Sequence, residues 1–111
     1  MNGNLCLGEN IADLGGITIA YYAFKKTPQG QSTETIDGLT PDQRFFYGFA
    51  RIWAGEIRPK EAARRIIVDP HSPAMYRVNG SISNLPEFYA AFNVKEGDAM
   101  WRPDSIRAKI W

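Results

Sequence analysis

One stretch, residues 40–57, constrains the fold more than any other part of this 111-residue chain. It begins with TPDQ, in which Thr40 can cap a helix, Pro41 suits the first helical position and Gln43 can close a capping box. The segment that follows, RFFYGFARIWAGEI, carries apolar side chains at helical spacing: Phe45, Phe46, Phe49, Ile52 and Trp53. The pattern predicts a helix over residues 41–57 that is buried on most of its circumference.

A second helix is predicted over residues 7–26, where apolar side chains again recur at helical spacing. The pair Gly15 and Gly16 interrupts its good helix formers. Each glycine costs a helix interior about 1 kcal/mol relative to alanine. We therefore expect a packing reason for the pair, such as the close approach of another backbone.

Two shorter helices are predicted over residues 59–68 and 85–92. The first starts at RPKE, and its Arg64 and Arg65 are expected to face water. Its apolar side chains are expected to face inward: Ala62, Ala63, Ile66 and Ile67. The second, LPEFYAAF, has Asn84 placed to cap its first turn.

The remaining segments have no sustained period. Residues 27–38 are polar and rich in turn formers, which is typical of a surface loop. Residues 68–80 contain two prolines and a glycine and read as irregular, with at most one short strand around residues 76–82. The tail, residues 93–111, holds apolar anchors expected to fix it to the body: Met100, Trp101, Ile106, Ile110 and Trp111.

Length and charge narrow the classes of function. A chain of 111 residues with 44% apolar content suits one small domain. Thirteen basic residues against twelve acidic ones leave a net charge of +1, which argues against a nucleic-acid-binding face. No apolar run approaches the roughly 20 residues that cross a bilayer.

Metal-binding residues are scarce. Cys6 and His71 are the only residues of their types, so no internal disulfide can form. A catalytic zinc site takes about three protein ligands. Any such site must therefore be shared with another polypeptide or with a segment outside this chain. Cys6 itself, with no nearby base to activate it, is expected to act as a small apolar residue.

Two carboxylates in GENIADLGG are spaced for a common task. Glu9 and Asp13 are four residues apart, so in a helix both leave the same face about one turn apart. Like charges at this spacing repel unless a cation, a proton or a histidine lies between them. The alternative is a pair of exposed acids near the positive end of a helix.

The segment DPHSPAMYR gathers polar groups around the lone histidine. Asp69 precedes His71 by two residues, Ser72 follows it, and Arg77 lies six residues further on. The simplest interpretation is a loop histidine bonded to its own backbone and an arginine at the surface. An imidazole beside an arginine would also suit stabilising a carbonyl oxygen that becomes negative. A Ser-His-Asp triad is disfavoured because no nucleophile elbow surrounds Ser72.

In series, NGNLCLGENIADLGG, FFYGFARIWAGEIRPKEA, DPHSPAMYRVNGSISNLPEFYAAF and a terminal tryptophan resemble the C-terminal part of the catalytic domain in the neprilysin and endothelin-converting-enzyme family of zinc metallopeptidases. The resemblance covers nearly the whole chain, in order and with compatible spacing. It implies a mainly α fold with long irregular loops, the C-terminal helical subdomain of a zincin, or thermolysin-like, metallopeptidase. Residues 1–111 would then be a single fragment of that domain.

The resemblance also implies roles for the paired acids. Glu9 falls on the third zinc ligand. Asp13 falls on the acid that holds a zinc-binding histidine through its outer nitrogen. The repulsion between the two carboxylates would then be offset by a dication and by a hydrogen bond.

Further roles follow for the other candidates. His71 corresponds to the histidine that stabilises the tetrahedral oxyanion, and Arg77 to the arginine that binds the substrate's backbone carbonyl. Asp69 is expected to orient the imidazole of His71. Ile52 and Trp53 match positions near the apolar pocket for the residue after the scissile bond. The implied reaction is peptide hydrolysis on the amino side of hydrophobic residues, with a zinc-activated water and a glutamate base.

One departure from the family is decisive. The family carries two zinc histidines and the base in an HExxH helix upstream, and this chain has no HExxH. The parent protein is expected to bind one zinc ion, to act on peptides and to be extracytoplasmic or membrane-anchored. The isolated chain is expected to be inactive, to hold zinc weakly or not at all, and to pair with the upstream HExxH portion. Alternatives are a non-catalytic helical interaction module or one half of a split peptidase.

The same absence predicts association. A helix that normally packs under a zinc site exposes apolar surface when its partners are missing, and such surface favours contact between molecules. We expect a homodimer through the helix at residues 7–24 or through the surroundings of Trp53.

Overall fold

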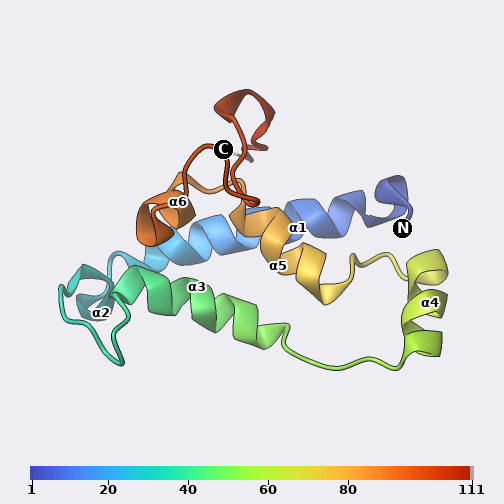
Figure 1. Cartoon of the computed structure of the whole chain (residues 1–111), viewed down its shortest axis with the longest axis horizontal. Helices are drawn as coiled ribbons and strands as arrows, with labels where there is room; N and C mark the ends of the chain where they lie inside the picture. Colours follow the sequence, from blue (N-terminus) through green and yellow to red (C-terminus); the bar gives the residue numbers. More distant parts are fainter. Residues whose placement is uncertain (111) are drawn as a thin grey trace.

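Helix α1 (Gly3–Phe24) is the longest element and runs along the long axis of the molecule, and α5 packs against it (Figure 1). The structure, a computed structural model, describes residues 1–110. Over this range it is mainly helical and has no strand beyond a single bridge between Ile36 and Leu39. The other helices are α2 (Pro28–Gln31), α3 (Pro41–Ile52), α4 (Pro59–Val68), α5 (Ala74–Ile82), α6 (Pro86–Phe92) and the short 3₁₀ helix η1 (Asp104–Ile106).

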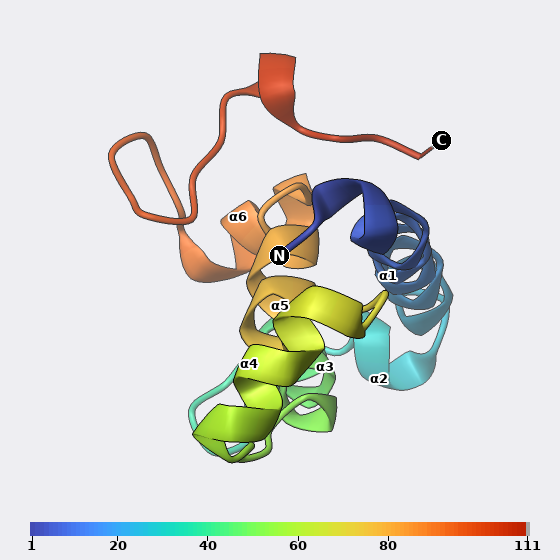
Figure 2. The ribbon, with the colours of Figure 1, turned by 90° about the vertical axis from the view of Figure 1, so that its right-hand side faces the viewer.

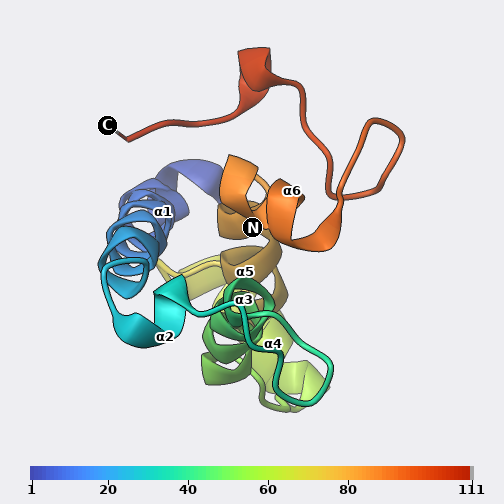
Figure 3. The same ribbon diagram turned by 90° about the vertical axis from the view of Figure 1, so that its left-hand side faces the viewer.

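The elements form two sides around α1 and α5. Helix α5 packs against α1, and α3 packs against both α5 and α6. End-on views show the C-terminal segment running over the side of the molecule opposite α3 and α4 (Figure 2, Figure 3). Along residues 1–110, none of the helices is both long enough and apolar enough to cross a membrane.

Local capping explains where α1 and α3 begin. The side chain of Asn2 accepts hydrogen bonds from the backbone of Asn4 and Leu5, so α1 starts four residues before the predicted position. The predicted capping box of α3 is present. The Thr40 hydroxyl accepts from the backbone N–H of Gln43 at 3.2 Å, and the side-chain oxygen of Gln43 accepts from the backbone N–H of Thr40 at 3.0 Å.

Helix α3 is shorter and more open than the sequence predicts. It ends at Ile52 rather than at residue 57, because its last turn closes with bonds from Trp53 to Ala50 and from Ala54 to Arg51. Phe46 is buried, but Ile52 is 73% exposed. The expectation of burial around most of its circumference is therefore wrong.

Helix α5 replaces the irregular segment or short strand expected at residues 68–82. It begins after Pro73, whose carbonyl accepts from Tyr76 and Arg77. Val78 and Ile82 are buried, and the helix packs on α1. A helix this short is marginal by itself, so tertiary packing rather than local propensity stabilises it.

Asn84 does not cap α6, which is preceded by Leu85 and has no side-chain cap. Instead, the side chain of Asn84 donates to the carbonyl of Gly80 at 2.6 Å and accepts from the backbone N–H of Ala108 at 2.8 Å. Asn84 therefore fixes the tail to the end of α5. The tail anchors Met100 and Ile110 pack on the core, whereas Ile106 is exposed. The expected anchor Trp111 lies outside the described residues.

The expected inward face of α4 is absent. None of its residues is buried, and Ile67 is 75% exposed. Figure 1 shows the reason: α4 lies at one end of the molecule, reached from α3 by an extended connection. The period of its sequence is that of an amphipathic helix, but within residues 1–110 no element covers its apolar side.

The hydrophobic core joins α1, α3, α5 and α6. Its buried members are Leu14, Ile17, Tyr21, Phe46, Val78, Ile82, Leu85 and Phe88. The rings of Tyr21 and Phe46 stack with centroids 5.6 Å apart, and Phe88 meets Phe46 edge-on at 5.5 Å. Of the glycine pair, Gly15 is buried. At Gly16, no described neighbour comes within 4 Å of where a Cβ would lie, so no other backbone approaches closely at that position.

Candidate active site

Glu9 and Asp13 leave α1 one turn apart and differ sharply in exposure. The side chain of Glu9 is 42% exposed, whereas that of Asp13 is 10% exposed. Glu9 meets His71 in the loop between α4 and α5, and Asp13 meets Arg77 on α5. The two acids therefore face protein partners rather than open water.

His71 lies between two carboxylates. Its Nδ1 is 2.7 Å from Asp69 Oδ1, and its Nε2 is 3.2 Å from Glu9 Oε2. The backbone N–H of His71 also donates to Asp69 Oδ1, at 2.9 Å. These bonds from the backbone and the imidazole of His71 lower the pKa of Asp69. Asp69 is thus placed to orient the ring, and the ring meets Glu9 rather than only its own backbone.

Arg77 and Asp13 form a paired, largely buried contact. Arg77 Nε and Nη2 donate to the two carboxylate oxygens of Asp13, each at 2.6 Å. Arg77 is only 13% exposed, and its guanidinium lies 3.9 Å from the ring centroid of Trp53. The hydrogen bonds to Asp13 raise the pKa of Arg77 above its usual value. The interpretation of Arg77 as a surface cation is therefore wrong.

The Arg77–Asp13 pair was missed from the sequence. Its two members are 64 residues apart, and no local period relates them. Asp13 is expected to hold a zinc-binding histidine, and its bonds to Arg77 leave room for that, since a carboxylate offers about four acceptor positions.

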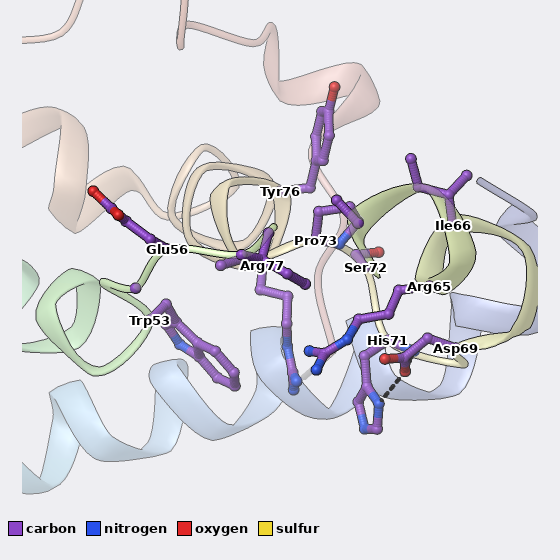
Figure 4. Close-up of a pocket in the computed structure, with 14 residues that line it drawn as sticks. Trp53, Glu56, Arg65, Ile66, Asp69, His71, Ser72, Pro73, Tyr76 and Arg77 are labelled. Atoms are coloured by element: carbon purple, nitrogen blue, oxygen red, sulfur yellow. Dashed lines mark hydrogen bonds and ion pairs between the residues drawn. The ribbon is translucent and has the colours of Figure 1, made fainter. Parts of the chain in front are cut away.

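A cavity of about 550 Å³ opens beside these groups (Figure 4). His71 and Arg77 lie along α1 on one wall, and Trp53 closes the end nearest α3. Apolar parts of the lining come from Ile57, Ile66 and Tyr76. Ile52 does not line it; its side chain borders a separate groove between α1 and α3, beside Gly16.

Cys6 and Ser72 lie beside these groups and are both buried. Cys6 is buried, with its Sγ 3.9 Å from the carbonyl oxygen of Asp69, and contacts the loop as a small apolar residue. Ser72 is also buried, and its hydroxyl donates to Asn10 of α1 at 2.8 Å. The Ser72 hydroxyl is thus committed to α1 and does not serve a Ser-His-Asp arrangement.

The donor set fits part of a metal site. Among residues 1–110, no group of three or more His, Cys, Asp or Glu side chains could hold a metal ion. Glu9 can supply one carboxylate ligand, because its side chain is partly open to the outside of the molecule. Its neighbour Asp13 can orient a ligand supplied from elsewhere.

Comparisons with known proteins show the family of this chain. The sequence pattern of Peptidase family M13 matches residues 1–107. The chain is 42% identical to human endothelin-converting enzyme 1 over 115 aligned positions, covering 100% of this chain and 14% of that protein. It is 43% identical to mouse membrane metallo-endopeptidase-like 1, covering 100% of this chain and 15% of that protein.

A solved structure matches as well. The crystal structure of the zinc metalloprotease Zmp1 of Mycobacterium tuberculosis, in complex with an inhibitor, superposes with a TM-score of 0.92 at 47% identity. The match covers 98% of this chain and 17% of Zmp1. The fold therefore matches that of one part of a zinc metalloprotease. The chain belongs to Peptidase family M13 and spans about 14% of the length of human endothelin-converting enzyme 1.

Proposed function

We propose that this chain is the C-terminal part of the catalytic domain of a zinc endopeptidase. Glu9 contributes one zinc ligand, and an upstream HExxH portion contributes the two histidines and the general base. Membership of the family and the small share of each relative that the chain spans support this division. The absence of HExxH from this sequence also supports it.

The observation that carries the proposal is the approach of His71 Nε2 to Glu9 Oε2, at 3.2 Å. A metal ligand and a donor to the oxyanion must both lie within a few ångströms of the same reacting carbonyl. Glu9 and His71 are 62 positions apart in the chain, so only the fold brings them together. Zinc, when bound, would polarise the peptide carbonyl and make a water more acidic.

His71 acts as the donor to the oxyanion. Asp69 holds Nδ1 at 2.7 Å, which fixes the ring plane and leaves Nε2 pointing along α1 toward Glu9. In its doubly protonated form the ring donates to Asp69 from one nitrogen and to the developing negative oxygen from the other. Asp69 is a positioning residue, because it acts through the imidazole.

Arg77 binds the backbone carbonyl of the peptide. A guanidinium has five N–H donors, and the two bonds to Asp13 use two of them. Asp13 and the ring of Trp53 hold the guanidinium in one orientation, so little side-chain entropy is lost when a substrate arrives. Asp13 also orients a zinc-binding histidine of the upstream portion.

The cavity beside these groups takes the side chain after the scissile bond. Its apolar lining from Trp53, Ile57 and Ile66 favours hydrophobic residues at that position. This supports cleavage on the amino side of hydrophobic residues. Ile52 borders the separate groove between α1 and α3, so the cavity gives no support for placing it in this pocket.

We extend the proposal to the complete protein, which would be extracytoplasmic or membrane-anchored. One relative carries "membrane metallo-endopeptidase" in its name, which supports this location. The partners are peptide substrates and the upstream portion; the even charge balance, +1 overall, gives no support for nucleic acid.

Calorimetric zinc titration and a peptide-cleavage assay test the proposal. The 111-residue chain is expected to bind zinc weakly and to cleave nothing, because it lacks two ligands and the base. A longer polypeptide that carries the HExxH portion is expected to bind one zinc and to turn over. In it, Glu9→Gln should weaken zinc binding, while the exposed control Glu96→Gln should not. Tight stoichiometric zinc and turnover by the short chain would refute the division.

A further inference from the structure

Asn10 and Ser72 are hydrogen bonded across the site, yet the proposed reaction gives neither of them a part. Ser72 Oγ donates to Asn10 Oδ1 at 2.8 Å. The bond joins α1 to the loop between α4 and α5, and Ser72 is only 5% exposed. A bond sheltered from water is costly to lose, because each partner is then left unsatisfied.

The two bonded residues each adjoin a residue of the proposed reaction. Asn10 follows Glu9 on α1, and Ser72 follows His71 on the loop. Neighbouring Cα atoms are about 3.8 Å apart, so a bond between Asn10 and Ser72 restricts how far the Glu9 carboxylate and the His71 imidazole can separate. The contact therefore acts on the 3.2 Å approach of those two groups.

Little else holds the loop at this point. Helix α4, which precedes it, has no buried residue and so gives the loop only a weak anchor. The contact of Cys6 Sγ with the Asp69 carbonyl is long, at 3.9 Å, and a thiol is a weak donor. The strong Asp13–Arg77 pair lies beyond the loop, on α5.

The three contacts fall on one face of α1. Cys6, Asn10 and Asp13 are spaced i, i+4 and i+7, which places them in a row along the helix. In order along the helix, these three residues contact Asp69, Ser72 and Arg77. The middle contact, between Asn10 and Ser72, is the one whose two residues directly follow Glu9 and His71 in the chain.

We propose that the Asn10–Ser72 hydrogen bond is a positioning contact that holds the His71 imidazole against Glu9. Its effect on peptide cleavage rests on the function proposed above, whereas its effect on the position of His71 does not. Both residues act through their neighbours and touch no substrate.

His71 makes the test direct, because it is the only histidine and gives one imidazole set in the proton NMR spectrum of the 111-residue chain. Ser72→Ala is expected to shift and broaden the His71 resonances and to remove their Overhauser contacts with α1. Ser72→Thr, which keeps the hydroxyl, should restore them. Ser83→Ala is the matched control: Ser83 is equally buried but donates within its own helix end, to Gly80 at 3.2 Å.

Asn10→Ala removes the other partner of the bond and is the second variant. Circular dichroism checks that each variant is folded. It should displace His71 as Ser72→Ala does, and the double variant should add nothing further. Unchanged His71 resonances in both single variants overturn the proposal. An equal displacement by Ser83→Ala also overturns it, since the effect would then follow from general loosening.

In the longer polypeptide with HExxH, Ser72→Ala should lower kcat by about 10- to 100-fold with KM little changed, because a misplaced donor weakens mainly the transition state. An unchanged kcat beside a displaced His71 overturns the catalytic part of the proposal. Absence of peptidase activity from every form, beside a displaced His71, refutes the proposed function and leaves the positioning contact in place.

Discussion

The face of α1 that meets α5 and the apolar side of α4 share a helical period but differ in burial. Both were predicted as helical from the period of their residues. On α1, Asp13 and Leu14 are covered by α5 and the core, whereas on α4 Ile67 is 75% exposed. The difference teaches that a periodic sequence specifies a helix without specifying what packs on it.

The largest effect on stability is expected when the guanidinium paired with Asp13 is removed. Arg77→Ala leaves a 10%-exposed carboxylate without its partner, and we expect a loss of about 3–5 kcal/mol in the free energy of unfolding. Urea denaturation followed by circular dichroism measures it. Arg64→Ala, which breaks an exposed pair with Glu61 on α4, should lower the free energy of unfolding far less, because solvent screens the charges of an exposed pair. Similar losses for both variants would erase the distinction between the two regions.

Truncating apolar side chains sharpens the comparison. Ile82 is 6% exposed and lies in the core under α1. Ile82→Ala is expected to cost about 2–5 kcal/mol of unfolding free energy, through lost burial and the cavity left behind. Ile67→Ala on α4 should stay within about 0.5 kcal/mol. A large cost at Ile67, measured by the same denaturation, would mean that α4 is covered in solution.

Self-association tests which exposed surface is used. On α1, Ile11 and Ile19 are 46% and 55% exposed, and we expect a homodimer through this helix. The double variant Ile11→Lys and Ile19→Lys should raise the dimer dissociation constant by at least about tenfold, since each loses about 1–2 kcal/mol of apolar burial. Sedimentation velocity measures it, with Ile67→Lys as the control. A stronger effect of the control would move the contact to α4.

The smallest expected effect is on how the helicity of α4 depends on pH. Hydrogen bonds from Arg64 and Arg65 lower the pKa of Glu61 from 4.5 to about 2. Because the folded value is the lower one, this stabilisation is complete above about pH 4.5 and is lost as the pH falls through about 2. Glu61→Gln should flatten that part of the acid titration of helicity. The side chain of Glu61 is 36% exposed, so solvent screens its charge, and a large change in the stability of the whole fold would contradict the assignment.

Where a feature depends on near neighbours in the chain, the sequence was enough to predict it. The capping box of Thr40 and Gln43 spans three residues and was anticipated. The common face of Glu9 and Asp13 follows from the helical repeat. The pairing of Asp69 with His71, two residues apart, was expected as an orienting contact, and the structure brings the two together at 2.7 Å.

Other features needed partners far along the chain. Arg77 pairs with Asp13 across 64 positions and Ser72 with Asn10 across 62. Helix α5 was missed because its residues favour a helix only when Val78 and Ile82 are buried. Trp53 lines the cavity beside His71 and Arg77, whereas Ile52, its neighbour in the chain, borders another groove, and neither position could be read from the sequence.

The sequence by itself determined the mainly helical class, the capping of α3, the common face of Glu9 and Asp13, and the lack of a complete set of zinc ligands. These depend on short-range periodicity and on which residues exist. Only the tertiary structure decided that His71 meets Glu9, that Arg77 is buried on Asp13, and that α4 stays uncovered. The physical reason is that burial and long-range pairing depend on how helices cross in space, and that geometry is set by the summed packing of the whole core rather than by any local stretch.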